Sequence, residues 1–267
     1  HNGIIGDLKK AVAYYNNNRP RVPNQIKAPI PNGLDWSLFQ GPSKRKHYTF
    51  NTWDYNWRWY GWDFGTGEAG NNATHELDIA RWALGVHYPE RVDVYSSKNH
   101  FIDDGWTMYD TMEAKFHFPN NLKIDWNCHS RNAHHNKTMG GRGTIIYGSM
   151  GSALVSRNGY TVYDLNGKEI KNSISGDKES STQLGGGGNM TTKHFRNFFN
   201  SIRSGEVLNS PINDAVISQS MVHYANLAHR SGKSFKIDSR NGNILDSKIK
   251  KKFWSREYEK GWNLNFV

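Results

Sequence analysis

Hydrophobic positions between residues 75 and 85 repeat at helical spacing. Two sets of apolar residues recur three and four positions apart, namely Leu77, Ala80 and Leu84, and Ile79, Trp82 and Ala83. Because both sets can face other protein, we expect a helix that is buried on most sides. Gly85 can take the left-handed conformation that ends a helix, and Pro89 prevents its continuation. Asn71, Asn72 and Thr74 are candidate N-caps.

The spacing changes to strict alternation further along the chain. Apolar residues alternate with polar ones over 112–118 and again over 122–128, and the turn-forming residues Pro-Asn-Asn separate the two runs. This pattern predicts an antiparallel hairpin with one buried face, on which Cys128 lies as a structural residue. Shorter apolar runs predict further strands at 8–15, 92–94, 144–147, 153–155 and 160–163. The strands together indicate a broad, largely antiparallel sheet.

Two more helices are predicted in the last third of the chain. The first spans about 191–204, with an apolar stripe of Phe195, Phe198, Phe199 and Ile202. The second spans about 213–231. A polar and glycine-rich loop over 173–189 precedes them, and its GGGG run lacks the Lys-Ser/Thr ending of a phosphate loop, so we interpret it as a linker.

The first turn of the helix after residue 73 carries a titratable side chain, His75. His75 and Asp78 share one helix face, so Asp78 could determine which ring nitrogen of His75 carries the proton. Glycines and tryptophans precede this turn, from Trp53 onward. An imidazole in such surroundings is typical of a site for a small polar ligand, although a histidine at a helix start can equally be a cap or a buried structural group.

The segment Gly65–Gly70, GTGEAG, matches the G-x-G-x-x-G fingerprint of dinucleotide-binding proteins. That fingerprint requires a short apolar strand before it and an acidic residue about 20 positions later. Glu90 lies at a suitable distance, but the preceding residues, WRWYGWDF, are aromatic rather than rich in Val and Ile. His75 and Glu76 are also bulky where close helix–strand packing requires small side chains. We therefore interpret the match as accidental.

Composition and charge narrow the class of protein. A chain of 267 residues can bury a core, and 10 Trp, 13 Tyr and 12 Phe compensate for a mean hydropathy of −0.79. The net charge of +10 is scattered apart from a cluster at 248–252, and no nucleic-acid motif accompanies it. No apolar run is long enough for a membrane span, and a single cysteine excludes an internal disulfide. We therefore predict neither a nucleic-acid partner nor a membrane span.

Several motifs along the chain occur in a characteristic order. They are GTGE-x-GN-x-x-TH-x-x-DIARW-x-LG at Gly65–Gly85, GTIIYGSMGSALV at Gly143–Val155, MTTKHFRNFFNSIRSGE at Met190–Glu206, PINDAVISQSMVHYANLAHRSGKSFKID at Pro211–Asp238 and LDSKIKKKFWSREYEKGW at Leu245–Trp262. In this order they resemble the C-terminal domain of the Gfo/Idh/MocA family of NAD(P)-dependent sugar and polyol oxidoreductases, in a bacterial branch.

The resemblance implies an α+β fold with a large open, mostly antiparallel or mixed sheet and helices packed on one face. It implies a single substrate-binding and oligomerisation domain over residues 1–267, with a basic and aromatic tail from about 240. An N-terminal Rossmann domain, holding NAD or NADP, would precede residue 1 and is not part of this chain. The other face of the sheet would form a homo-oligomer interface. Bacterial cytoplasm and periplasm both remain open as the compartment.

The resemblance also assigns the active-site histidine to His75, which would accept a proton from a sugar hydroxyl as hydride leaves the carbon. Typical members carry Asp four residues earlier, where this chain has Asn71; an amide cannot take up that proton but could hold a hydroxyl. Further substrate-binding candidates are Trp57, Trp59 and Trp62 for stacking on a sugar, and Arg58, Asp63 and Arg131 for polar contacts. The tryptophans could equally be core residues. His134-His135 lacks a third ligand, so no metal site is predicted.

The sequence therefore favours the substrate-binding domain of an NAD(P)-dependent oxidoreductase acting on a sugar, polyol or sugar derivative by hydride transfer. Two alternatives stay open. One is a stand-alone carbohydrate-binding or scaffolding module without redox activity. The other is an NAD-assisted glycosidase or lyase that acts through a keto-sugar intermediate.

If the GTGEAG match is accidental, the 267-residue chain by itself has no cradle for a pyrophosphate. We expect it to bind NAD more weakly than the micromolar range in a calorimetric titration, and to transfer no hydride alone. A micromolar dissociation constant would show that the GTGEAG segment is a genuine dinucleotide fingerprint.

Overall fold

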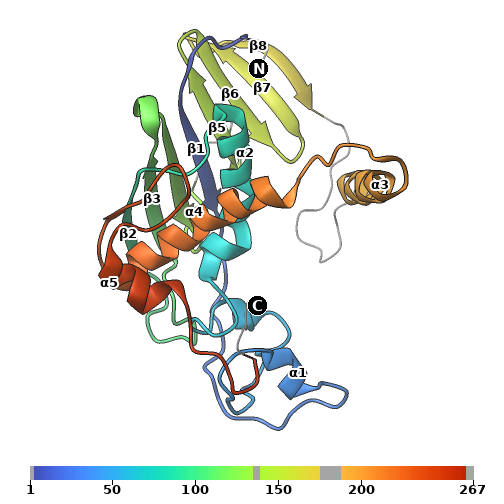
Figure 1. The fold of residues 1–267 in the computed structure, drawn as a ribbon, viewed down its shortest axis with the longest axis vertical. Helices are drawn as coiled ribbons and strands as arrows, with labels where there is room; N and C mark the ends of the chain where they lie inside the picture. The colour runs from blue at the N-terminus through green and yellow to red at the C-terminus, as the bar shows by residue number, and fades with distance from the viewer. Residues whose placement is uncertain (1–2, 135–138, 175–187, 263–267) are drawn as a thin grey trace.

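The fold is organised around one large sheet. The computed structural model describes residues 3–134, 139–174 and 188–262 (Figure 1). Within these ranges the sheet has nine strands in the order β8-β7-β6-β5-β1-β4-β3-β2-β9. The strands are β1 (Leu8–Asn16), β2 (Arg91–Ser97), β3 (Thr111–His117), β4 (Lys123–His129), β5 (Arg142–Gly148), β6 (Gly151–Ser156), β7 (Gly159–Asp164), β8 (Glu169–Ile174) and β9 (Phe235–Lys236). Only the central β1–β4 pair is parallel, so the prediction of an open, mostly antiparallel or mixed sheet is confirmed.

The predicted hairpin is formed by β3 and β4. Ala114 pairs with Trp126, and Phe116 pairs with Ile124, so the alternating apolar residues meet on one face. All four of these side chains are fully buried. Asn120 takes a φ of 59° in the connecting turn, which asparagine tolerates better than most residues.

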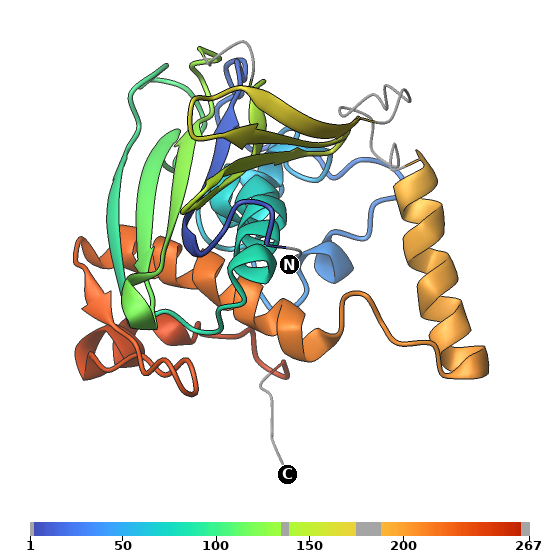
Figure 2. The ribbon, with the colours of Figure 1, turned by 90° about the horizontal axis from the view of Figure 1, so that it is seen from above.

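Helices cover one face of the sheet. The α-helices are α1 (Trp36–Gln40), α2 (Thr74–Leu84), α3 (Gly188–Ser204), α4 (Ile212–Ser231) and α5 (Ser247–Ile249), and shorter helical turns are η1 (Asn56–Arg58), η2 (Ala69–Ala73), η3 (Pro119–Asn121) and η4 (Lys250–Trp254). Figures 1 and 2 show α2 and α4 packed on the same side of the strands. None of the helices in the described ranges is both long and apolar enough to cross a membrane.

Helix α2 buries one stripe rather than two. Leu77, Ala80 and Leu84 are buried against the sheet and α4, as predicted. The second predicted stripe is wrong, because Trp82 is 68% exposed. The other two members of that stripe, Ile79 and Ala83, are half-buried. Gly85, at a φ of 65°, ends the helix as expected.

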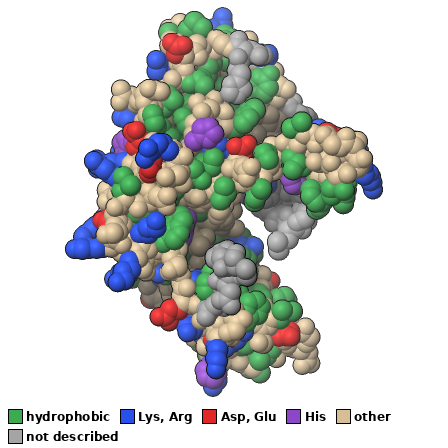
Figure 3. All heavy atoms as spheres, viewed as in Figure 1, with side chains coloured by type: hydrophobic (Ala, Val, Ile, Leu, Met, Phe, Trp, Pro, Cys, Tyr) green, Lys and Arg blue, Asp and Glu red, His purple; other side chains and the backbone are tan. Residues whose placement is uncertain are grey.

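Helix α3 stands apart from the sheet (Figures 1 and 2). Its predicted apolar stripe is therefore exposed rather than buried, with Phe195 at 54% and Ile202 at 69%. Phe198 and Phe199 contact each other at a ring-centroid distance of 5.6 Å, so the phenylalanines pack mainly on themselves. Figure 3 shows hydrophobic side chains gathered on this helix. The GGGG linker before it lies largely outside the described residues.

The uncovered face of the sheet carries the alternate side chains of the strands. Glu113 and Lys115 on β3 are exposed, as are Tyr95 on β2 and Tyr147 on β5. This face is thus a mixture of charged residues and tyrosines. The homo-oligomer interface implied for it by the family resemblance stays a prediction.

Replacing Phe116 with Ala should lower the free energy of unfolding by about 3–5 kcal/mol, since a fully buried ring would leave a cavity. The matched control is Phe198→Ala on α3, where the ring is 46% exposed and little packing is lost. Urea denaturation followed by tryptophan fluorescence measures both. Similar losses for the two variants would contradict the assignment of the core.

Candidate active site

The chain enters α2 through a wide helical turn, η2. Residues Ala69–Ala73 form this π-helical turn, and the backbone is already helical at Glu68. Asn71, Asn72 and Thr74 therefore lie inside a continuous helical segment, and the prediction that one of them is the N-cap is wrong. The Thr74 hydroxyl instead donates a hydrogen bond to the carbonyl of Gly70 at 3.2 Å.

The glycines before this turn serve close packing. A side chain at Gly65 would come within 2.5 Å of the Arg58 Cα, and one at Gly70 would meet the Thr66 side chain. The residues that precede them form turns and the short η1, so no strand leads into the GTGEAG segment. A dinucleotide fingerprint requires that strand. The described residues therefore do not form a pyrophosphate cradle at this position.

A buried ion pair fixes the start of the helical segment. The Glu68 carboxylate is fully buried, and Arg19 donates to it from Nε at 2.6 Å and from Nη2 at 3.1 Å. Asn72 donates a further hydrogen bond to the same carboxylate. Burial alone would lower the pKa of Arg19, but the charge and hydrogen bonds of Glu68 raise it overall. The chain leaving β1 is thus locked to the helix that carries His75.

Asn71 connects this ion pair to a small cavity. Its amide Nδ2 donates to Glu68 Oε1 at 3.0 Å, and its Oδ1 accepts from Arg58 Nε at 3.2 Å. Arg58 in turn lies over the rings of Tyr55 and Trp57, 4.2 and 4.3 Å from their centroids. The cavity has a volume of about 200 Å³ and is lined by Trp57, Arg58 and Asn71 among others. Three of the predicted site residues are therefore brought together here.

His75 faces a different and larger cavity. The residue is exposed, and it lines a cavity of about 600 Å³ between α2 and the first half of α4, together with Asp78, Val216 and Gln219. Partial burial of the ring lowers the pKa of His75, and Glu76 opposes this shift. A lowered pKa favours the neutral imidazole, which can accept a proton.

Asp78 shares this cavity with His75 but is engaged elsewhere. Ser218 on α4 donates a hydrogen bond to the Asp78 carboxylate, and Arg81 lies 3.8 Å from it. The Asp78 charge raises the pKa of His75, but this effect is weaker than the lowering that burial causes. Its predicted role in orienting the ring stays a prediction.

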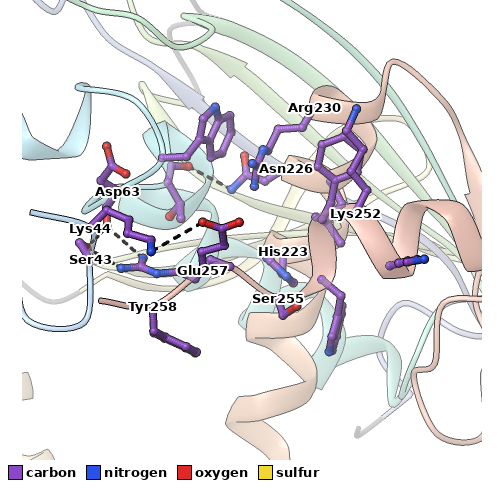
Figure 4. Close-up of a pocket in the computed structure, with 17 residues that line it drawn as sticks. Ser43, Lys44, Asp63, His223, Asn226, Arg230, Lys252, Ser255, Glu257 and Tyr258 are labelled. Carbon is purple, nitrogen blue, oxygen red and sulfur yellow. Dashed lines mark hydrogen bonds and ion pairs between the residues drawn. The ribbon is translucent and has the colours of Figure 1, made fainter. Parts of the chain in front are cut away.

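Trp62 and Asp63 line a third cavity, of about 650 Å³, between the aromatic loop, α4 and the C-terminal tail (Figure 4). Asp63 forms an ion pair with Lys46, and Trp62 lies beneath the Arg230 guanidinium. The predicted site residues are thus distributed over three separate cavities rather than one.

Two predicted ligand contacts do not fit the structure. Trp59 is 1% exposed and stacks on Trp106 at a centroid distance of 4.1 Å, so it has no face to offer a sugar. Arg131 is 5% exposed and donates to the carbonyls of His100 and Pro20 and to Asp104. Trp59 therefore has no exposed surface for a ligand. Arg131 uses both Nη atoms within the protein, and its buried Nε has no hydrogen-bond partner there.

No metal centre emerges from the described part of the chain, where no group of three or more His, Cys, Asp or Glu side chains could hold an ion. His134 lies in this part, whereas His135 lies outside it. The sequence analysis missed Glu68 and Arg19, which organise the site. Glu68 lies in the GTGE segment, but nothing in the sequence relates it to Arg19, which is 49 positions away.

Replacing Glu68 with Gln would leave the buried Arg19 charge without a carboxylate partner. We expect the free energy of unfolding to fall by about 3–5 kcal/mol, as measured by urea denaturation. Adding Arg19→Gln should recover part of this loss, because the unpaired charge is then removed. The control Asp238→Asn breaks an exposed pair with Arg240 and should show no comparable loss. Additive effects of Glu68→Gln and Arg19→Gln would contradict the pairing.

Comparison with known proteins identifies the domain. The family described as "Oxidoreductase family, C-terminal alpha/beta domain" matches residues 42–237. No curated protein matches the chain.

Several solved structures share the fold at low sequence identity. An oxidoreductase from Agrobacterium radiobacter, solved with NAD+, L-tartaric acid and magnesium, is 13% identical with a TM-score of 0.58, over 88% of this chain and 58% of its own. A levoglucosan dehydrogenase, solved with NADH and L-sorbose, is 16% identical with a TM-score of 0.57, over 89% of this chain and 60% of its own. An aldose-aldose oxidoreductase from Caulobacter crescentus, solved with glycerol, is 14% identical with a TM-score of 0.55, over 88% and 57%.

The chain spans less than two thirds of the length of each of these structures. At such identities the similarity establishes the fold alone, whereas the family match covers most of the residues described above. The chain therefore belongs to the Gfo/Idh/MocA oxidoreductase family, as its C-terminal alpha/beta domain.

Proposed function

We propose that this domain is the substrate-binding part of an NAD(P)-dependent oxidoreductase that acts on a sugar, polyol or sugar derivative by hydride transfer. One observation carries the proposal: an accessible, neutral imidazole, His75, faces a cavity of about 600 Å³ that can admit a small polar ligand. Similar structures were solved with NAD+ or NADH, and with L-sorbose or glycerol, which supports this substrate class.

His75 acts as the general base in this proposal. When a substrate hydroxyl carbon loses hydride, its oxygen must lose a proton, and a neutral imidazole within hydrogen-bond reach can take it. A bound nicotinamide dinucleotide supplies the hydride acceptor. Because the GTGEAG glycines are used for packing, the dinucleotide would be held by a Rossmann domain outside this chain.

Asn71 and Arg58 contribute binding rather than proton transfer. The Asn71 amide is held between Glu68 and Arg58, and an amide has no proton to give or take at neutral pH. Arg58 lines this cavity and carries further N–H donors, so it can hold a substrate oxygen there. Trp57, in the same cavity wall, offers an apolar surface beside it.

Replacing His75 with Gln in the natural full-length protein should lower kcat/KM by about 10²–10⁴-fold, since the base is removed. The assay follows absorbance of NADH or NADPH with a panel of sugars and polyols. The matched control is His87→Gln, an exposed histidine just beyond α2, which should keep wild-type activity. The wild-type rate should fall as the pH drops below the pKa of His75, because protonated His75 cannot accept a proton. Partial burial places this pKa below the ordinary value of 6.5.

Full turnover by the His75→Gln variant, with an unchanged pH profile, would refute the role of His75. Turnover of a glycoside without net reduction of NAD would favour the NAD-assisted glycosidase or lyase instead. Sugar binding without either reaction would favour the binding module.

A further inference from the structure

The C-terminal tail borders the cavity that Trp62 and Asp63 line, at a distance from His75. Helical turn η4 and the residues after it cross α4 and approach the loop around Ser43 and Trp62 (Figure 4). Arg256 holds them there, donating to the carbonyl of Asp63 at 2.9 Å and to the Ser43 hydroxyl. The resulting cavity has a volume of about 650 Å³.

Positive charge in this cavity exceeds what its carboxylates balance. Asp63 is already paired with Lys46, and Glu257 lies 3.7 Å from Lys44. Four more cationic residues line the cavity, and no carboxylate within the described ranges forms an ion pair with any of them; they are Arg230, Lys251, Lys252 and Arg256. The cavity is therefore electropositive.

Arg230 is positioned by contacts with two aromatic rings. Its guanidinium carbon lies 4.9 Å from the centroid of Trp62 and 5.2 Å from that of Phe253. Stacking on rings uses the face of the guanidinium and leaves its in-plane N–H donors free. None of the described residues accepts a hydrogen bond from these donors. Burial of part of the side chain lowers the pKa of Arg230, and the residue as a whole is exposed.

This electropositive cavity and the His75 cavity each share lining residues with a smaller cavity along α4. The smaller cavity, of about 300 Å³, shares Thr66, His223 and Asn226 with the electropositive cavity, and shares Val216 and Gln219 with the cavity at His75. Gln219 and Arg230 are separated by a helical rise of about 16 Å. A ligand that reaches from His75 to Arg230 must therefore be longer than one sugar unit.

We propose that the groove along α4 binds an acidic oligosaccharide, with a carboxylate or sulfate group held by the Arg230 guanidinium between Trp62 and Phe253. The planar guanidinium matches both oxyanions through paired hydrogen bonds, and Lys251 and Lys252 add charge without fixed geometry. This inference rests on the proposed function, because it assigns the reacting end of the ligand to His75.

The experiment measures binding by the natural full-length protein at one constant ionic strength. Calorimetric titrations compare tetragalacturonate, a κ-carrageenan tetrasaccharide that carries sulfate but no carboxylate, and neutral cellotetraose. We expect at least one acidic ligand to bind at least tenfold more tightly than cellotetraose. Preference for tetragalacturonate would identify a carboxylate as the bound group, and preference for the carrageenan a sulfate.

Arg230→Gln should lower the affinity for the acidic ligand at least tenfold and leave the affinity for cellotetraose unchanged. Arg230→Lys should lose part of the affinity, because it keeps the charge but not the planar pair of donors; it also provides the test if Arg230→Gln does not fold. The matched control is Arg203→Gln on α3, which removes an exposed arginine that also lies over a ring, at 5.7 Å from Phe199. That variant should bind like the wild type.

Equal affinity for acidic and neutral ligands, or unchanged affinity in both Arg230 variants, would overturn the inference. So would sodium sulfate binding as tightly as the oligosaccharides, which would indicate an anion site without sugar recognition. Hydride transfer to neutral sugars without selectivity for acidic ones would overturn this inference alone. Acid-selective binding without hydride transfer would overturn only the proposed function.

Discussion

The buried ion pair between Arg19 and Glu68 is the constraint on which the arrangement of the site depends. A buried carboxylate is tolerated only when its lone pairs are occupied, and Glu68 meets this condition through Arg19, Asn71 and Asn72. The pair joins the end of the central strand β1 to the start of the helical segment. Since His75 follows on that segment, its position relative to the sheet is set by an interaction seven residues upstream.

Helix α4 is the second organising element, because the cavities at His75 and at Arg230 both lie along it. Gln219, on its exposed side, lines the cavity at His75, while Arg230 lines the other cavity near the C-terminal end of the helix. The tail then covers this end through η4, where Trp254 contacts the rings of His223 and Tyr224. A single helix thereby links a candidate reaction site to a candidate recognition site.

Most of the sheet could be predicted from the sequence, whereas the site could be predicted only in part. The alternation of apolar and polar residues in β3 and β4 predicted these strands correctly, because one face of the hairpin is buried along its whole length. The sequence cannot distinguish Trp59 from Trp62, because both lie in the same aromatic run. In the fold they differ, because Trp106 stacks on Trp59. The exposure of the α3 stripe could not be predicted from the sequence either. An apolar stripe indicates a surface that packs on a partner, but it does not show which part of the protein that partner is. Arg19 and Glu68 meet through the fold alone.

The π-helical turn at Ala69–Ala73 makes this segment sensitive to length as well as to composition. Such a turn contains one residue more than an ordinary helical turn, and it persists where surrounding contacts require it. Loss of one residue here would restore regular helix but rotate everything upstream by about 100° around the axis. Glu68 would then turn away from Arg19 while His75 stayed in place. Helical propensity would be intact, yet the coupling between the strand and the imidazole would be gone.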